Sequence, residues 1–218
     1  MKKIKIMKNG PYKVTGSIPL NELTVLANAD KYSYNEGEVF PVEETYFLCR
    51  CGHSKNPPFC DGSHIKAGFN GNCCQEEEHE TTIYENEKIT LLDTKKLCSS
   101  ARFCITNNSD IWKLIEDGNS DVVKKLAHDC PSGRLVVKEH NEVIEPVLEQ
   151  EISILQDNEK GCSGPIFVKG GIPIIDEENN ELTVRNRVTL CRCGASKNKP
   201  FCDASHIQER YNDKKTSN

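Results

Sequence analysis

Short runs of apolar, β-branched and aromatic residues recur along the chain, and two of them lead directly into cysteines. "ETYFLCRC" at 44–51 and "RNRVTLCRC" at 185–193 each predict a strand that delivers two cysteines. Upstream of them, "GPYKVTGSIPL" at 10–20 matches "GPIFVKGGIPI" at 164–174 in its Gly-Pro, central Val, following Gly and Ile-Pro. We therefore expect two copies of one small β-rich unit.

The middle of the chain has a different pattern. "KITLLD" at 88–93 predicts a strand, "SDVVKKLAHDC" at 120–130 a short helix capped by Ser120, and "GRLVVKE" at 133–139 a returning strand. Before this region, the acidic and poorly periodic "NCCQEEEHE" at 72–80 predicts a linker. The sequence thus predicts an α+β unit between the two β-rich copies.

These patterns divide the chain into three units, with 146–160 interpreted as a connector and the final "DKKTSN" as a frayed polar tail. In order, the units are a first repeat over 1–72, an inserted unit over 81–140 and a second repeat over 160–218. The predicted fold class is α+β, with two small β-rich units flanking an α+β domain.

The composition indicates how such small units are held together. Only 6% of the 218 residues are aromatic, so each core is modest, and small units of this kind usually need disulfides or a metal. Twelve cysteines are available. The N-terminal segment has lysines but no apolar signal-peptide core, and no stretch approaches the roughly 20 apolar residues of a membrane helix. We therefore expect a cytoplasmic protein without membrane contact, whose cysteines bind metal rather than form disulfides.

Net charge and motifs exclude several functions. The net charge is −5 and no basic tract occurs, so we expect no nucleic-acid partner. The sequence has no glycine-rich phosphate loop, no flavin or nicotinamide fingerprint, and no cysteine with an obvious catalytic base beside it. We therefore predict a protein that is not an enzyme.

The strongest chemical signal is a motif written twice. "CRCGHSKNPPFCDGSH" at 49–64 returns as "CRCGASKNKPFCDASH" at 191–206. The two copies differ only where His53, Pro57 and Gly62 become Ala195, Lys199 and Ala204. His53 therefore cannot be an essential ligand of a shared design. At position 204 alanine suits a first helical turn, provided that its φ is negative.

The spacing inside the motif predicts two pairs of ligands. Residues i and i+2 of a strand share a face, so Cys49 and Cys51 can reach the same metal atom. "CDGSH" places Asp61 as a helix N-cap, which sets Cys60 and His64 about one helical turn apart. Two pairs indicate two metal atoms, each held by one pair. A closed zinc site with three cysteines and one histidine is the alternative at this stage.

The first copy matches the signature of the CDGSH iron–sulfur (NEET) family, which it resembles in Cys-x-Cys, the following Ser, and Pro-x-Cys-Asp-Gly-Ser-His. Members of that family bind a [2Fe–2S] cluster through three cysteines and one histidine. The resemblance implies two ligand sets: Cys49, Cys51, Cys60 and His64 for one cluster, and Cys191, Cys193, Cys202 and His206 for the other. Single units of the family commonly pair as homodimers, so we expect the two copies in this chain to pair with each other.

A histidine ligand has consequences for function. A neutral imidazole in place of a thiolate makes a cluster easier to reduce, so the potential should lie between those of all-cysteine ferredoxins and of Rieske centres. We expect electron transfer or redox sensing with redox partner proteins. The alternative is storage of clusters and their transfer to apo-proteins.

The inserted unit carries a second set of cysteines. "CSSARFC" places Cys98 and Cys104 at the outer positions of a bacterial ferredoxin run, with Ala101 where the middle cysteine belongs, and Cys130-Pro131 supplies the remote cysteine. The region resembles the divergent single-cluster ferredoxin-like domain, which implies a [3Fe–4S] or [4Fe–4S] cluster. A scaffold that no longer holds a cluster is the alternative. We interpret the adjacent Cys73 and Cys74 as incidental and Cys162 as a buried or free thiol.

Overall fold

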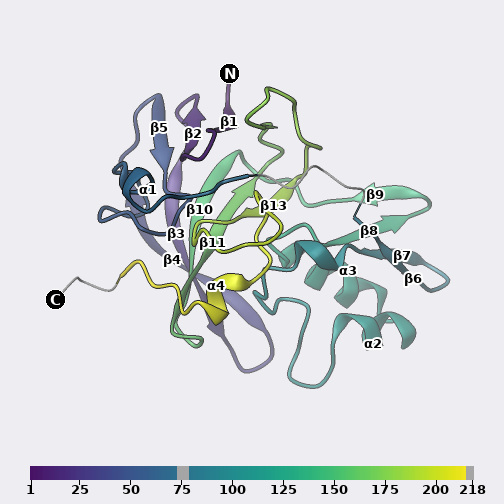
Figure 1. Cartoon of the computed structure of the whole chain (residues 1–218). Helices are drawn as coiled ribbons and strands as arrows, with labels where there is room; N and C mark the ends of the chain where they lie inside the picture. The colour runs from purple at the N-terminus through teal and green to yellow at the C-terminus, as the bar shows by residue number, and fades with distance from the viewer. Residues whose placement is uncertain (73–78, 215–218) are drawn as a thin grey trace.

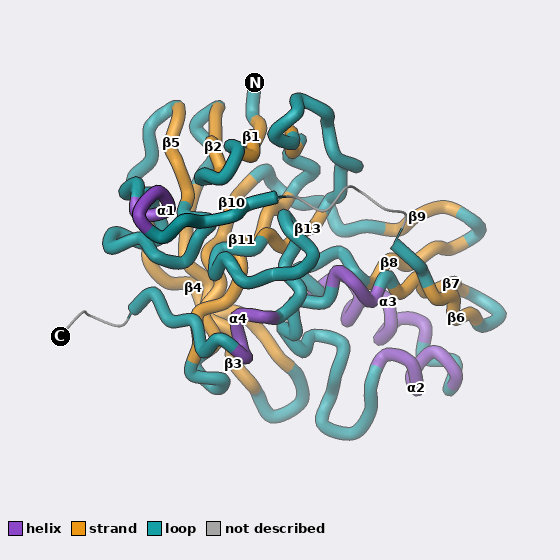
Figure 2. Tube along the Cα trace, in the orientation of Figure 1, coloured by secondary structure: helices purple, strands orange, loops and turns teal. Residues whose placement is uncertain are grey.

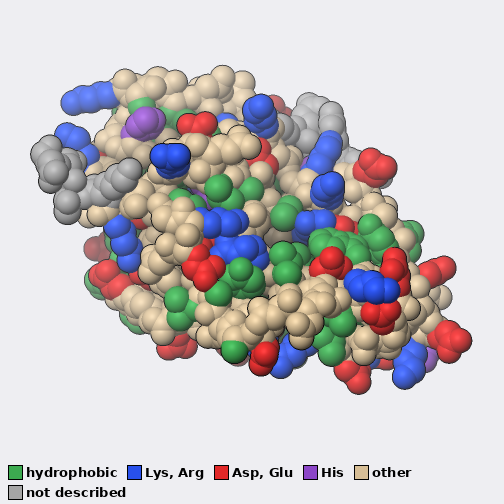
Figure 3. Space-filling view, turned by 90° about the horizontal axis from the view of Figure 1, so that it is seen from below, with side chains coloured by type: hydrophobic (Ala, Val, Ile, Leu, Met, Phe, Trp, Pro, Cys, Tyr) green, Lys and Arg blue, Asp and Glu red, His purple; other side chains and the backbone are tan. Residues whose placement is uncertain are grey.

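A computed structural model describes residues 1–72 and 79–214 (Figure 1). The fold is α+β with a large excess of strand, and its helices are short (Figure 2). No helix in the described part of the chain is long and apolar enough to cross a membrane. Acidic and basic side chains are interspersed on the face seen from below (Figure 3).

The first sheet has the order β12-β1-β2-β5. Its strands are β1 (Lys3–Ile6), β2 (Tyr12–Thr15), β5 (Thr45–Leu48) and β12 (Ile174–Ile175). The first three belong to the first repeat and β12 to the second. Because β12 lies parallel to β1, with Ile4 opposite Ile174, the second repeat completes the sheet of the first.

The second sheet reverses this exchange, with the order β13-β11-β10-β3-β4. Its strands are β3 (Leu20–Ala27), β4 (Tyr32–Phe40), β10 (Glu151–Asp157), β11 (Cys162–Lys169) and β13 (Arg187–Leu190). Here β3 of the first repeat lies parallel to β10, with Leu20 opposite Ile152. The first repeat therefore lends β3 and β4 to the second sheet, and the second repeat lends β12 to the first.

The interpretation of 146–160 as a connector is wrong. Glu151–Asp157 forms β10, a strand at the centre of the second sheet, and six of its seven residues are buried. Ile152 and Ile154 enter one hydrophobic core that takes residues from both repeats, including Ile4 of the first and Ile166 of the second. Because apolar side chains of both repeats are buried in this shared core, the hydrophobic effect holds the two repeats together.

The inserted unit has its own sheet and core. Four antiparallel strands in the order β6-β7-β8-β9 carry two helices between β7 and β8. The elements are β6 (Thr82–Glu85), β7 (Ile89–Asp93), η1 (Lys95–Leu97, a 3-10 turn), α2 (Ile111–Glu116), α3 (Ser120–Asp129), β8 (Leu135–Glu139) and β9 (Glu142–Ile144). The predicted strands at 88–93 and 133–139 and the helix at 120–130 are present.

Two details of the inserted unit differ from the prediction. Helix α2 was not predicted; its N-cap Asp110 accepts a hydrogen bond from the backbone amide of Lys113. Ser120 is the first residue of α3 rather than its cap, because Asn119 holds the capping position without a side-chain hydrogen bond. The buried Ser120 hydroxyl lies within hydrogen-bond distance of Asn86 instead.

Candidate metal centres

The first copy of the motif brings its four candidate ligands together as two pairs. β5 ends at Leu48, and the chain after it places the sulfurs of Cys49 and Cys51 3.8 Å apart. At the other end of the motif, the short helix α1 (Ser63–Lys66) places His64 Nδ1 3.5 Å from the sulfur of Cys60. The expected strand-derived pair and helix-derived pair are therefore both formed.

The second copy repeats this geometry closely. The sulfurs of Cys191 and Cys193 lie 3.7 Å apart after β13. The helix α4 (Ser205–Gln208) places His206 Nδ1 3.4 Å from the sulfur of Cys202. Within residues 1–72 and 79–214, no three His, Cys, Asp or Glu side chains converge on one point that could hold a single ion.

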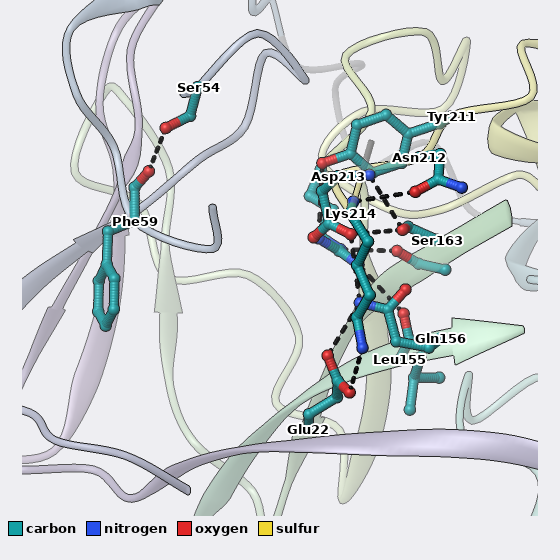
Figure 4. Close-up of polar contacts among 12 residues, drawn as sticks. Glu22, Ser54, Phe59, Leu155, Gln156, Ser163, Tyr211, Asn212, Asp213 and Lys214 are labelled. Carbon is teal, nitrogen blue, oxygen red and sulfur yellow. Dashed lines mark hydrogen bonds and ion pairs between the residues drawn. The ribbon is translucent and has the colours of Figure 1, made fainter. Parts of the chain in front are cut away.

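A loop that folds back on the strand carries the second pair to the first. The backbone amide of Cys49 donates to the carbonyl of Pro58, and that of Cys60 donates to the carbonyl of Phe47. Ser54 fixes the loop from inside, because its hydroxyl donates to the carbonyl of Phe59 at 2.6 Å (Figure 4). In the second copy Ser196 donates to Phe201 in the same way, at 2.7 Å.

The aspartate of the motif closes the loop rather than capping the helix. Asp61 accepts from the backbone amides of Lys55 at 2.8 Å and Ser63 at 2.9 Å, and these bonds hold its pKa below the ordinary value. The N-cap residue is Gly62, in the left-handed region at φ 84°. The expectation that Asp61 would be the N-cap is therefore wrong by one residue.

Ala204 occupies the same left-handed conformation, with φ 69°. A positive φ removes the condition under which alanine would suit this position better than glycine. The conformation turns the amide of Ala204 toward the sulfur of Cys202, at 3.4 Å. The second copy thus keeps an N–H donor to its third cysteine but carries backbone strain that Gly62 avoids.

Backbone amides and neighbouring thiols set the charge of the strand-derived pairs. The hydrogen bond from Cys51 lowers the pKa of Cys49 to about 6. Sharing that proton raises the pKa of Cys51, and the backbone amide of His53 donates to its sulfur at 3.4 Å. In the second copy the same arrangement lowers the pKa of Cys191 to about 6 and raises that of Cys193. Each pair therefore offers a thiolate, the form that binds metal.

The two candidate centres lie next to each other. Cys51 and Cys193 face each other as an antiparallel β-bridge. An open cleft of about 420 Å³ lies between the motifs, lined by equivalent residues of the two copies that include Phe69 and Tyr211.

Comparison with known families agrees with this arrangement. The model described as iron-binding zinc finger, CDGSH type, matches residues 9–65 and 163–207, and the model described as divergent 4Fe-4S mono-cluster matches 84–140. The chain is a tandem CDGSH-type protein with an inserted divergent 4Fe-4S domain. Both matches support an iron–sulfur protein. No curated protein and no solved structure matches it.

The arginine between the first two cysteines is a functional residue that the sequence analysis missed. Arg50 and Arg192 are buried at 1% and 2% exposure, on the side of the chain opposite to the cysteines. Arg192 donates to the carbonyls of Gly164 at 2.7 Å and Leu155 at 3.1 Å. The available signal was that the same arginine stands between the first two cysteines in both copies. They hold the CDGSH strands against the core.

The expectation of a frayed tail from residue 213 is wrong for Asp213 and for Lys214, which forms an ion pair with Glu22. Asp213 forms an ion pair with Arg192 and accepts a hydrogen bond from Gln156 at 3.2 Å (Figure 4). The carboxylate also accepts from the hydroxyl of Ser163 at 2.5 Å. The segment after α4 thereby closes over the strand that carries Cys191 and Cys193. Residues 215–218 lie outside the described part.

In the inserted domain, Cys98, Cys104 and Cys130 line one small cavity together with Ala101 and Arg134. Burial raises the pKa of Cys104 to about 12. Arg134, which is paired with Asp93 through two hydrogen bonds of 2.5 and 2.7 Å, brings a positive charge to these thiols. The cavity measures about 20 Å³, so its walls would have to separate to admit a cluster.

Among the remaining cysteines, only Cys162 lies in the described part of the chain, and it does not join a candidate centre. Cys162 is buried at 5% exposure at the start of β11, where burial raises its pKa. Its position opposite Asp157 in the sheet agrees with the interpretation as a buried thiol. Cys73 and Cys74 lie outside the described residues.

Proposed function

We propose that this protein holds two [2Fe–2S] clusters, each through three cysteines and one histidine. The observation that carries the proposal is the distance within each ligand pair. Two thiolates on one tetrahedral metal, at the usual ~2.3 Å, lie about 3.8 Å apart, and a thiolate and an imidazole nitrogen about 3.5 Å apart. The four pairs measure 3.8, 3.5, 3.7 and 3.4 Å. Each pair is spaced to bind one of two irons.

A zinc-stapled interaction module is the alternative without redox chemistry. It would need four ligands around one ion, whereas the side chains are grouped in twos. Visible absorption together with iron, sulfide and zinc analysis of freshly purified protein separates the two possibilities. We expect a coloured protein with about four irons and four sulfides for two [2Fe–2S] clusters. A colourless, zinc-loaded protein would refute the proposal.

Electron transfer or redox sensing is the role that the centres support best, with redox partner proteins and without catalysis by the chain itself. A bound [2Fe–2S] cluster would supply a one-electron couple, and the residues around it would tune that couple. Amides aimed at Cys51 and Cys202 and the partly or fully buried imidazoles of His64 and His206 favour a higher potential than an all-cysteine site. Cluster storage and transfer to apo-proteins is the second candidate, favoured by the solvent-accessible Cys60 and His64 of the first site.

The inserted domain is proposed to be ferredoxin-like, with a third cluster on Cys98, Cys104 and Cys130. The shared cavity and the charge of Arg134 support this assignment, which ranks below the CDGSH sites because the cavity is small. Three cysteines suit a [3Fe–4S] cluster, and a [4Fe–4S] cluster would need another ligand. Iron beyond about four atoms per chain that is lost on changing Cys104 to Ser would support it.

The two CDGSH units are proposed to act as an internal pair, in place of a homodimer. The strand exchange between β1 and β12 and between β3 and β10 supports a pair made within one chain. Size-exclusion chromatography with light scattering tests this, and we expect a monomer near 24.5 kDa. An obligate dimer would count against the proposal.

A further inference from the structure

The same ligand motif is buried to different depths in the two CDGSH units. Cys202 and His206 are 3% and 4% exposed, whereas Cys60 and His64 are only half-buried. Positions in the ligand loop show the same trend, among them Ser54 and Ser196, Asn56 and Asn198, and Phe59 and Phe201, whereas the strand-derived Cys193 is half-buried where Cys51 is buried. Because the two motifs are nearly identical, the cause must lie outside them.

The inserted domain supplies the additional cover. Asn198 in the second ligand loop donates to the carbonyl of Lys96 at 3.0 Å. Leu97, the next residue, is 2% exposed and belongs to the core shared by the two repeats. Cys98 then lines a cleft of about 630 Å³ whose opposite wall includes Ala204. In Figure 1, α1 of the first site lies at the edge of the molecule away from the inserted domain.

A clamp of charged residues holds the cysteine loop of the inserted domain on the second unit. Arg102 donates to both carboxylate oxygens of Asp157, at 2.6 and 3.1 Å, and to Glu159 at 3.1 Å. Lys160 donates to the carbonyl and hydroxyl of Ser100, at 2.9 and 2.8 Å. The Arg102 and Asp157 side chains are only 14% and 8% exposed, so the pair is worth more than a surface ion pair.

A second link connects the inserted domain to the strand that carries the second site. Arg187, at 1% exposure on β13, donates to the carbonyls of Cys130 at 2.6 Å and Leu135 at 3.0 Å. The equivalent residue of the first unit is Thr45. Only the second unit therefore has this arginine contact. It attaches the inserted domain to β13 at a residue four positions before Cys191.

We propose that the inserted domain seals the second CDGSH site, which makes the first site the one that exchanges its cluster with other molecules. This inference rests on the proposed function of two bound clusters. The outer ligand pair Cys60 and His64 is open to a chelator or an acceptor protein, whereas Cys202 and His206 become accessible only when the clamp opens. The second site is therefore a retention site and the first an exchange site.

Chelation with EDTA in the presence of iodoacetamide tests the proposal on the full chain. When a site is emptied, its two ferric ions leave as EDTA complexes and its two sulfides leave protonated. The three freed thiolates are alkylated as iodide departs, so no oxidant or reductant is needed. Iron and sulfide are measured first. A protein that lacks them, or alkylation that does not depend on EDTA, would refute the proposed clusters rather than the seal.

For the wild-type protein we expect the visible absorbance of the two [2Fe–2S] clusters to bleach in two phases of similar amplitude. Mass spectrometry should find Cys60 alkylated with the fast phase and Cys202 with the slow one. We expect the two rates to differ by about tenfold or more, as local opening of a buried site requires. Equal rates, or earlier alkylation of Cys202, would overturn the proposal.

Loosening the clamp gives an independent result. Arg102→Ala combined with Lys160→Ala should accelerate the slow phase several-fold toward the fast one and leave the fast phase unchanged. Lys113→Ala is the control, because it removes the ion pair between Lys113 on α2 and the C-cap residue Asp117, whose side chains are 60% and 45% exposed. The control should change neither phase. Equal acceleration of both phases by the clamp variant would show general destabilisation and contradict the seal.

Discussion

Gly52 and Gly194 occupy equivalent positions on either side of the contact between the two CDGSH sites. A Cβ on Gly52 would meet the carbonyl oxygen of Cys193 at 2.5 Å, and a Cβ on Gly194 would meet that of Cys51 at 2.5 Å. Both glycines also have positive φ, at 79° and 81°. The pairing of the sites therefore depends on the absence of a side chain at two positions, one from each repeat.

The first prediction concerns this close approach. Gly194→Ala should lower the free energy of unfolding by roughly 2–4 kcal/mol, the sum of left-handed strain and overpacking against a backbone carbonyl that cannot move freely. Urea denaturation followed by circular dichroism measures the change. Gly62→Ala is the matched control, since Gly62 has φ 84° but nothing within 4 Å of an added Cβ. It should cost only the strain, about 1–2 kcal/mol. Equal costs for the two variants would rule out a role for the close contact.

The second prediction is that the second CDGSH unit is stabilised by the glycine that the first one has. Ala204 lies at φ 69°, so Ala204→Gly relieves strain in the folded state and loses some of that gain to the freer unfolded chain. We expect a net stabilisation of about 0.5–1 kcal/mol in urea denaturation, with the iron content unchanged. A destabilised variant would mean that the methyl group of Ala204 makes a contact whose stabilisation exceeds the backbone strain.

The third prediction concerns pH. Burial raises the pKa of Asp213, but the charge of Arg192 and the hydrogen bonds from Ser163 and Arg192 outweigh burial and hold the pKa below its ordinary value. Since the folded pKa is lower than that of the unfolded chain, ~3.9, the stabilisation is fully present above the unfolded value. It is lost as the pH falls through the folded value.

Asp213→Asn tests this pH dependence, because it leaves the buried Arg192 without its carboxylate. At pH 7 the variant should be less stable than the wild type by ~3 kcal/mol. The difference should shrink once the pH falls below about 4. Urea denaturation of both proteins across this range provides the measurement. A stability difference independent of pH would show that Asp213 acts by packing and not by charge.

The fourth prediction concerns the seam between the inserted domain and the second unit. Arg187→Ala leaves the carbonyls of Cys130 and Leu135 and the carboxylate of Glu145 without their buried donor. We expect a loss of about 3–5 kcal/mol in the free energy of unfolding. The exposed Lys113→Ala variant should change it by less than ~1 kcal/mol. If Arg187→Ala were equally mild, the seam would not depend on this contact.

The sequence was sufficient to predict the local and repeated features of the candidate sites. Alternation placed the two cysteines of each strand together, and comparison of the copies removed His53 from the ligand set. β10 was missed because it pairs with β3 of the first repeat as well as with β11 of the second. No local sequence pattern predicts such a long-range pairing. A signal did exist at Arg187, whose equivalent in the first unit is Thr45. This difference between two otherwise similar strands indicates that only the strand with Arg187 contacts the inserted domain.

The last prediction concerns the histidine ligands themselves. Replacing a neutral imidazole by a thiolate adds a negative charge to the site, which disfavours the reduced state, so His206→Cys should lower the potential of the second site. The shift should be on the order of 100 mV, judged from the interval between all-cysteine ferredoxins and Rieske centres. His64→Cys should lower the potential of the first site by less, because the half-buried His64 is better screened by solvent than His206 at 4% exposure. Redox titration followed by electron paramagnetic resonance resolves the two couples. Unchanged potentials in both variants would mean that neither histidine binds iron.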